Sequence, residues 1–478
     1  MSRGLPARPV RRVILISLDC LRADHLGCYG YPADTSPHLD ALAREGVRFE
    51  QCTAASNWTP PSHASMFTGT WPTEHGVHAF DARMASACAT AAELFSAAGW
   101  HTTALSTWRC FSDKASLTRG FHDCLVYGGD KGKGNAELQT ANALRWLDIH
   151  RDEPFYLFLH YGQIHAPYEL CPGFEAQDLP LPADRRARLL WERNTLPGWV
   201  HLLRSVSDRV DGRKPFGRLV HKAVRWAEFH FVQTLNQVIV AINKGRLPLD
   251  DEVRTFLVAR YDNCIRYVDQ RIGEVATWLR DAGLWEETLI IITGDHGDEF
   301  GEHRGVGHGH TLFQEVVRVP LIFTGGAVEG MRRVPAVVAG HCDILPTQLA
   351  AAGLAIPDSL RGRSLWDQLD ARADDRVMYS ENFGQQREKA CLVRWPWKYT
   401  VDLTGRSDRL HNLAQDSGER VEVDGEAAAV REELAIEIAA FMRSLDEHRP
   451  VPGGSGSDPG AADLDEQLKE QLEQLGYL

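Results

Sequence analysis

The chain has 478 residues, of which 44% are hydrophobic and 24% charged, and its formal net charge is −13. This is an ordinary globular composition, and the length predicts one large domain accompanied by a smaller one. The sequence pI of about 5.9 indicates an acidic surface, which disfavours nucleic acid as the main partner.

The N-terminus carries no recognisable targeting segment. Residues 1–12 are basic and contain proline, and the apolar run at 13–18 is too short for a signal-peptide core or a membrane span. The ten cysteines form no C-x-x-C pair, so neither a zinc knuckle nor a redox motif is expected. We therefore expect a cytoplasmic protein with no integral membrane segment.

Short apolar runs alternate with helical patterns along most of the chain. The branched apolar residues at 13–18 predict a buried strand that ends at Asp19. Ser36 followed by Pro37 is typical of a helix N-terminus, and Gly46 is expected to end that helix. The elements expected in chain order are a strand at 13–18, a helix at 36–43, a strand at 47–50, helices at 60–68 and 89–98, and strands at 101–105, 155–160, 289–293 and 320–323. This alternation predicts an α/β fold with a parallel sheet.

Residues 181–250 differ from the rest of the chain. They carry thirteen Lys and Arg against six Asp and Glu, together with several aromatic residues. We expect a helical insertion at about 181–258, inside a large domain at 11–372. It is interpreted as a packing or homo-oligomer surface, as a lid that attracts an anionic substrate, or as a segment that touches lipid.

The C-terminal part changes to shorter strands. Runs at 377–380, 390–395 and 398–403 precede a helix at about 426–445, which predicts a small α+β domain at 373–448. A glycine- and proline-rich linker and a short charged helix at 449–478 end the chain.

Two acidic groups follow predicted strands, where open α/β sheets place their sites. Asp19 ends the first strand, and the pair Asp295 and His296 follows the strand at 289–293. Carboxylates with one imidazole suit a divalent cation such as calcium, manganese or zinc. A strand-end aspartate is also a common helix cap, so each group taken alone is a weak signal.

A hydroxyl stands at the start of the second helix. Thr59 precedes Pro60 and Pro61, and helix N-termini favour anions through free N–H groups and the helix dipole. A metal-bound hydroxyl there would be acidified and placed in line with a bound ester. The alternative is that Thr59 only caps the helix.

Histidines gather in glycine-containing loops. His308 and His310 follow Asp295 in the segment GHGH, and His165 lies in QIHAPY after the strand at 155–160. A histidine can protonate a departing oxygen near neutral pH, although a single buried histidine is more often structural.

Together these motifs resemble the sulfatase family of the alkaline phosphatase superfamily over nearly the whole chain. The matching segments are LDCLRAD at 18–24, TPPSHASMFTG at 59–69, HAPY at 165–168, TGDHG at 293–297 and RVPLI at 318–322. The resemblance implies a large mixed, mostly parallel sheet sandwiched by helices, with a smaller C-terminal α+β domain.

The departures from this family bear on mechanism. Sulfatases carry a Cys or Ser that becomes formylglycine, whereas this chain has Thr59 there and His63 in place of the motif arginine. Threonine cannot give the same aldehyde, so no formylglycine is expected. The lysine–tryptophan–histidine element of many sulfatases is replaced by Thr107, Trp108 and Arg109. Threonine nucleophiles occur in phosphoryl-transferring relatives, and the ligand set resembles that of phosphonate monoester hydrolases.

The leading hypothesis is a metal-dependent hydrolase of a small phosphodiester, phosphonate ester or phosphate ester. The expected roles are one divalent cation on Asp19, Thr59, Asp295 and His296, with Thr59 as nucleophile, His308 or His310 as the leaving-group acid, His165 as oxyanion support, and His63 and Arg109 as weaker substrate contacts. The alternatives are a sulfatase that uses unmodified Thr59, and a catalytically inactive family member that acts as a binding protein.

Overall fold

The computed structural model describes residues 9–79, 82–111, 116–126, 136–168, 171, 239–240, 242–245, 248–370, 376–382, 388–403, 407–423 and 425–447. Most of the predicted insertion and the whole segment 449–478 lie outside these residues.

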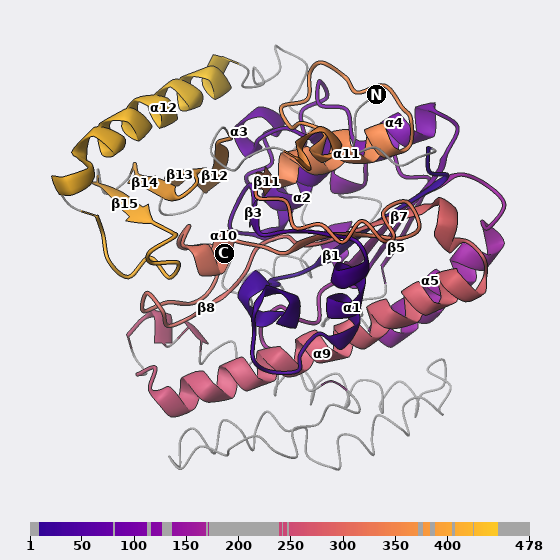
Figure 1. Cartoon of the computed structure of the whole chain (residues 1–478), viewed down its shortest axis with the longest axis horizontal. Helices are drawn as coiled ribbons and strands as arrows, with labels where there is room; N and C mark the ends of the chain where they lie inside the picture. The colour runs from indigo at the N-terminus through magenta and orange to yellow at the C-terminus, as the bar shows by residue number, and fades with distance from the viewer. Residues whose placement is uncertain are drawn as a thin grey trace, which may run out of the picture.

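The centre of the molecule is one mixed sheet of seven strands in the order β2-β10-β7-β1-β6-β4-β5 (Figure 1). Its strands are β1 (Arg12–Leu18), β2 (Val47–Phe49), β4 (His101–Ser106), β5 (Asp123–Val126), β6 (Phe155–Tyr161), β7 (Thr288–Gly294) and β10 (Leu321–Thr324). Strands β5, β4, β6, β1 and β7 run parallel, and β10 is antiparallel to both β7 and β2. The predicted mixed, mostly parallel sheet is confirmed, and β5 was not predicted.

Helices cover both faces of this sheet because alternate residues of its strands point to opposite sides. Ile14 and Ile16 of β1 join a core with α1 (Pro37–Glu45), α5 (Ala136–Ile149) and α9 (Asp251–Asp281). Val13 and Leu15 join the other core with α2 (Thr59–Thr68), α4 (Ala91–Ala97) and α11 (Ile344–Ala351). The short helices are α3 (Pro72–His75) and α10 (Gln314–Val317). Within the described residues, no helix is long and apolar enough to cross a membrane.

Helix α9 crosses the lower half of the view in Figure 1 and packs against α1 and α5. Asp250 caps it by accepting a hydrogen bond from the N–H of Val253 at 2.8 Å. Residues 251–258, which the sequence assigned to the insertion, form its first turns. Its apolar positions therefore belong to the core of the large domain.

A second, antiparallel sheet of four strands forms the C-terminal part. Its strands are β12 (Met378–Asn382), β13 (Lys389–Arg394), β14 (Trp397–Asp402) and β15 (Ser407–Asn412), in that order. Helix α12 (Ala428–Glu447) packs on this sheet through Leu434 and Ile438. The predicted small α+β domain is confirmed as a fold, and β15 was not predicted because its charged residues hide the alternation.

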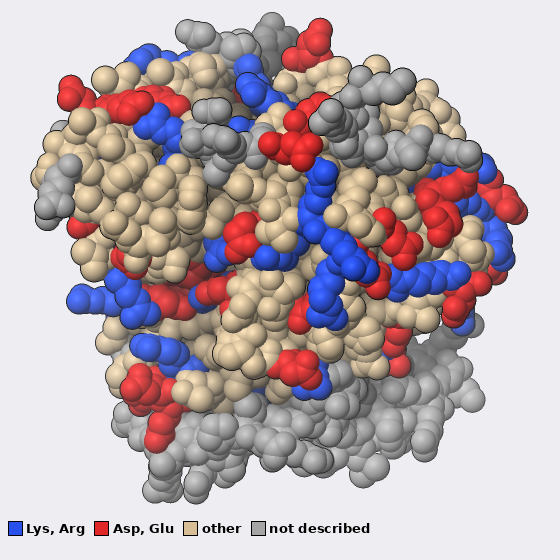
Figure 2. Space-filling view, in the orientation of Figure 1, with Lys and Arg blue, Asp and Glu red and all other residues tan. Residues whose placement is uncertain are grey.

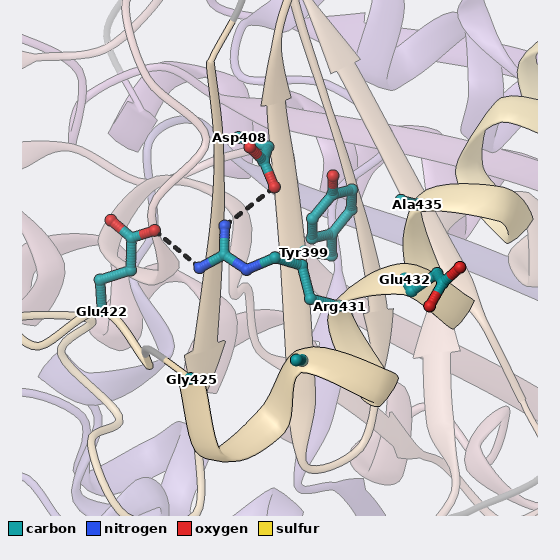
Figure 3. Close-up of a pocket in the computed structure, with 8 residues that line it drawn as sticks. Tyr399, Asp408, Glu422, Gly425, Arg431, Glu432 and Ala435 are labelled. Atoms are coloured by element: carbon teal, nitrogen blue, oxygen red, sulfur yellow. Dashed lines mark hydrogen bonds and ion pairs between the residues drawn. The ribbon is translucent and has the colours of Figure 1, made fainter.

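Arg431 ties α12 to this sheet (Figure 3). Its guanidinium lies 2.9 Å from Asp408 and 2.9 Å from Glu422, beside a cavity of about 490 Å³. Asp408 belongs to β15, so the ion pair joins two elements that the sequence separates by a turn. The guanidinium is neutralised on both sides.

Two small strand pairs complete the fold. Strand β3 (Gln51–Thr53) runs parallel to β11 (Val338–Gly340), and β8 (Glu299–Phe300) is antiparallel to β9 (Val306–Gly307). Strand β3 of the first pair lies between β2 and α2 in the chain, and the second pair lies in the loop that follows β7. Both loops border the site described next.

Candidate active site

The register of the central strands brings the two predicted acids together. Leu18 of β1 pairs with Gly294 of β7, so Asp19 and Asp295 both stand one residue beyond the carboxyl edge of the sheet. On the other side of β1, Leu18 pairs with Tyr161 of β6. Groups almost three hundred residues apart in sequence therefore lie side by side.

Asp19, Asp295 and His296 form a buried cluster whose candidate ligand atoms lie within 4.8 Å of one another. The Nε2 atom of His296 is 3.8 Å from Asp19 Oδ1 and 3.4 Å from Asp295 Oδ2. The Oδ1 atom of Asp295 accepts from the backbone N–H groups of Cys20 at 3.0 Å and His296 at 2.9 Å. Its Oδ2 atom is buried and accepts no hydrogen bond from any described residue.

An orphaned carboxylate oxygen beside a second carboxylate is costly unless a cation or a proton joins it. Burial raises the pKa of Asp295, and the charge of Asp19 raises it further. Burial also opposes ionisation of Asp19, but the neighbouring His165, His160 and His296 outweigh it and hold the pKa of Asp19 well below its usual value. Two oxygens and one imidazole that converge in this way fit a hard or borderline divalent cation.

Thr59 completes this cluster from the start of α2. Trp58 occupies the N-cap position, and no side chain caps the helix. The Oγ1 atom of Thr59 points instead at the metal-type cluster, 3.3 Å from His296 Nε2. The hydroxyl of Thr59 therefore does not cap the helix, which was the alternative considered from the sequence.

His63 holds the backbone of Thr59 in place. Its Nδ1 atom lies 2.8 Å from the carbonyl oxygen of Thr59, and its Nε2 atom lies 2.8 Å from the hydroxyl of Ser17. The ring is fully buried and packs on Phe111 and Phe158. Since both ring nitrogens contact the protein, this geometry favours a positioning role over the substrate contact expected from sequence.

A second group of side chains faces the same cluster from the loop after β7. His308 Nδ1 lies 2.6 Å from Asp298 Oδ1, and the hydroxyl of Tyr168 donates to Asp298 Oδ2 at 2.8 Å. Burial opposes protonation of His308, but Asp298 outweighs it, so the pKa of His308 lies above its usual value. The ring centroid of His308 is 4.1 Å from that of His296. His308 therefore lies beside the cluster of Asp19, Asp295 and His296, with Asp298 favouring its protonated form.

Of the remaining predicted site residues, His165 lies at the cluster and His310 does not. His165 lies in the same place, with its ring centroid 5.0 Å from that of His308 and its Nδ1 atom 2.6 Å from the carbonyl oxygen of Ala166. His310 is exposed, which separates it from the buried His308 two residues earlier. The side chain of Arg109 lies outside the described residues.

Three contributors were missed by sequence reasoning. His160 is the last residue but one of β6, and its buried Nε2 atom lies 3.6 Å from Asp19 Oδ2. Cys20 has a left-handed backbone with φ of 61°, and its Sγ atom lies 3.3 Å from Asp19 Oδ1. Asp298 closes the segment DHGD. His160 stood at a strand end, as the predicted acids did, and that signal could have found it.

The site and the fold define an ester hydrolase of the sulfatase and alkaline phosphatase superfamily. The family model described as Sulfatase matches residues 11–354, and the chain belongs to the sulfatase family. Members of this family typically bind a divalent metal, which the cluster of Asp19, Asp295 and His296 fits.

Several curated relatives are similar over most of their length. The chain is 23% identical to the uncharacterized sulfatase YidJ of Escherichia coli (strain K12), over 85% of this chain and 81% of the relative. It is 27% identical to human arylsulfatase A, over 75% of this chain and 67% of the relative.

Solved structures show the same fold. One is BT4656 in complex with its substrate D-glucosamine-2-N,6-O-disulfate, with a TM-score of 0.70 and 21% identity over 93% of this chain and 99% of that chain. Another is the phosphonate monoester hydrolase of Agrobacterium radiobacter, with a TM-score of 0.66 and 20% identity over 93% of this chain and 96% of that chain.

Proposed function

We propose that this protein hydrolyses a small phosphorus oxyanion ester, with Thr59 as the nucleophile. The observation that supports this most directly is the buried Thr59 Oγ1 atom, 3.3 Å from His296 Nε2, at the edge of a cluster suited to one divalent cation. Asp19, Asp295, His296 and Thr59 would hold that cation. When bound there, it supplies positive charge that lowers the pKa of a hydroxyl and withdraws electrons from the ester.

The first step is attack on the phosphorus atom, opposite the leaving oxygen, by Thr59 Oγ1 as an alkoxide whose proton has passed to solvent. The same alkoxide is released when water later opens the ester. The fixed backbone of α2, held by His63 at the carbonyl oxygen of Thr59, sets the direction of this attack. The new Thr59 ester forms as the bond from phosphorus to the leaving oxygen breaks.

His308 is the acid for that leaving oxygen. Its Nδ1 atom is occupied by Asp298, so the proton on Nε2 is the one available for transfer. The neutral ring left behind then accepts a proton from the water that attacks phosphorus and releases Thr59. His165, beside His308, supports the charge that develops on the oxyanion.

A second candidate is a sulfuric ester, again with unmodified Thr59. The names of the relatives favour it, since the two curated relatives described above are both sulfatases and BT4656 binds a sulfated sugar. Against it stands the side chain of Thr59, which cannot supply the second hydroxyl through which formylglycine expels sulfate. A threonine ester must instead be opened by water at sulfur or phosphorus.

The test is a parallel assay of the full-length protein, supplied with manganese, calcium or zinc, on four p-nitrophenyl esters: sulfate, phosphate, bis-phosphate diester and phenylphosphonate. We expect turnover of a phosphorus ester, and loss of at least about 10³-fold in the Thr59→Ala variant. Thr59→Ser, which keeps the hydroxyl, serves as the matched control and should keep part of the activity.

The outcomes separate the candidates. Turnover of the sulfate ester alone would show that the substrate is a sulfuric ester and not a phosphorus ester. Turnover that survives in Thr59→Ala, with metal still bound, would end the covalent mechanism for either element.

A further inference from the structure

A cavity of about 450 Å³ beside strand β2, at one edge of the main sheet, is lined by four arginines and one acid. Arg44 comes from α1, Arg48 from β2, and Arg332 and Arg333 from the loop before β11. Figure 2 shows basic side chains gathered near the middle of the face on which α1 lies in Figure 1. In a chain of net charge −13, such a concentration of guanidinium groups is a local exception.

The one carboxylate of this pocket is already engaged. Oδ1 of Asp40 accepts from the backbone N–H of Cys28 at 2.7 Å and from the hydroxyl of Ser36 at 2.9 Å. A Cβ atom on Gly27 would lie 2.2 Å from Asp40 Oδ2, so the carboxylate packs tightly against that backbone. No ion pair joins Asp40 to a pocket arginine among the described residues.

The arginines are neutralised unequally. Arg48 pairs with Glu50 at 2.8 Å, and Arg333 pairs with Asp370 at 2.7 Å. Arg44 and Arg332 are exposed, and neither has an acidic partner in the part of the chain that the structure describes. Two guanidinium groups of the pocket therefore lack an acidic partner, unlike that of Arg431 in Figure 3. When Glu50, Asp370 and Asp40 are set against the four arginines, the pocket keeps one positive charge.

The walls of the pocket are held in place without a ligand. The N–H of Arg48 donates to the carbonyl of Arg333 at 3.0 Å, and the N–H of Arg333 donates to the carbonyl of Gly46 at 3.1 Å. The guanidinium of Arg48 also lies over the ring of Tyr29, 4.6 Å from its centroid. The loop and the strand thus bring their arginines together before any anion arrives, which lowers the cost of binding.

We propose that this pocket is a second anion site, separate from the catalytic cluster, for a small molecule that carries a phosphate group. Planar guanidinium groups bind tetrahedral oxyanions through paired N–H donors, and they keep their charge at all physiological pH values. The volume exceeds that of one phosphate, and the two guanidinium groups without an acidic partner, Arg44 and Arg332, match one phosphate group. Few of the lining residues are apolar, which disfavours a hydrophobic ligand.

The experiment is isothermal titration of the full-length, metal-loaded protein with inorganic pyrophosphate and with fructose 1,6-bisphosphate, at low and at high salt. The test protein is the double variant Arg44→Gln with Arg332→Gln. The matched control is Arg145→Gln with Arg254→Gln, which removes the same charge from exposed sites outside the pocket. We expect at least tenfold weaker binding in the first variant alone, and weaker binding at high salt.

Hydrogen exchange in the wild-type protein gives a second readout that does not depend on the variants folding. Pyrophosphate should slow exchange in peptides that cover residues 40–49 and 328–334. Equal isotherms in all three proteins, equal weakening in both variants, or no protection of these two segments would each overturn the proposal. Tighter binding of one probe says whether the inorganic or the organic carrier is preferred.

Discussion

Two buried clusters of charged side chains contact opposite ends of the segment 308–314, one at His308 and one at Gln314, and they compensate their charges in different ways. Near the C-terminal sheet, Lys398 Nζ lies 2.9 Å from Glu419 Oε2, and both side chains are fully buried. That carboxylate also accepts from the backbone N–H of Gln314 at 2.6 Å. At the active site, Asp19 and Asp295 lie together with no lysine or arginine between them among the described residues.

The difference separates a structural use of buried charge from a functional one. In the first cluster an opposite charge and a backbone donor at Glu419 Oε2 offset much of the loss of water, although Glu419 Oε1 accepts no hydrogen bond from any described residue. In the second, like charges and an orphaned oxygen await a group that the chain does not supply. The second arrangement costs stability when no cation occupies it, which agrees with the cation site proposed above.

The largest effect should come from neutralising the functional cluster. In Asp295→Asn, turnover should fall by at least about 10³-fold, since one ligand of the cation loses its charge. In EDTA, however, the free energy of unfolding should stay equal or rise by about 1 kcal/mol, because repulsion of Asp19 is removed. Urea unfolding in EDTA and steady-state kinetics measure the two effects. A marked loss of stability would mean that Asp295 is structural.

The structural cluster should respond in the opposite way. Lys398→Met leaves Glu419 buried without its cation, and we expect a loss of about 3–5 kcal/mol in the free energy of unfolding. The double variant Lys398→Met with Glu419→Gln removes the stranded charge and should recover much of that loss. Urea denaturation of the three proteins checks this. Recovery of none of it would show that Lys398 acts through packing rather than charge.

The comparison can be sharpened within the catalytic loop itself. His308→Gln should lower turnover about 10²-fold for an ester with a poor leaving group, and less for p-nitrophenol, which leaves without a proton. His310→Gln, two residues on and exposed, is the matched control and should leave turnover nearly unchanged. The measurement is turnover over a series of phenols of rising pKa. The same slope in both variants would remove His308 from the role of acid.

Sequence reasoning reached the functional cluster better than the structural one, and the reason is physical. Asp19, Asp295 and Thr59 stand at the ends of strands or the start of a helix, so local pattern and strand register predict where they meet. His308 was expected, but its distinction from His310 depends on burial, which the GHGH segment does not encode. The pair of Lys398 and Glu419 joins two polar positions through tertiary packing, and no local pattern marks it.

The same limit applies to whole elements. Strand β15 was missed because its inward residues, such as Leu410, are few among charged neighbours. The start of α9 was absorbed into the predicted insertion, since its first turn at 251–254 is charged and mostly exposed and shows no apolar stripe of its own. In both cases the structure depends on burial against elements distant in sequence, and the intrinsic secondary-structure preferences of the residues alone do not predict it.

Glu381 of β12 is a third buried acid. It accepts hydrogen bonds, as Glu419 does, but it forms no ion pair with any described residue, as Asp295 forms none with a lysine or arginine. It accepts from the N–H and the hydroxyl of Thr73 and from the hydroxyl of Tyr379. Burial outweighs these donors and raises its pKa to about 7.

Because the folded pKa of Glu381 lies above its unfolded value, the native state binds the proton more tightly. Its contribution to stability is full below the unfolded pKa and is lost as pH rises toward 7. We expect the wild-type protein to lose about 2 kcal/mol more of its unfolding free energy between pH 5 and pH 7.5 than Glu381→Gln, which cannot ionise. Urea unfolding across this range measures the difference. Parallel curves for the two proteins would mean that the three donors already hold Glu381 ionised, as an opposite charge would.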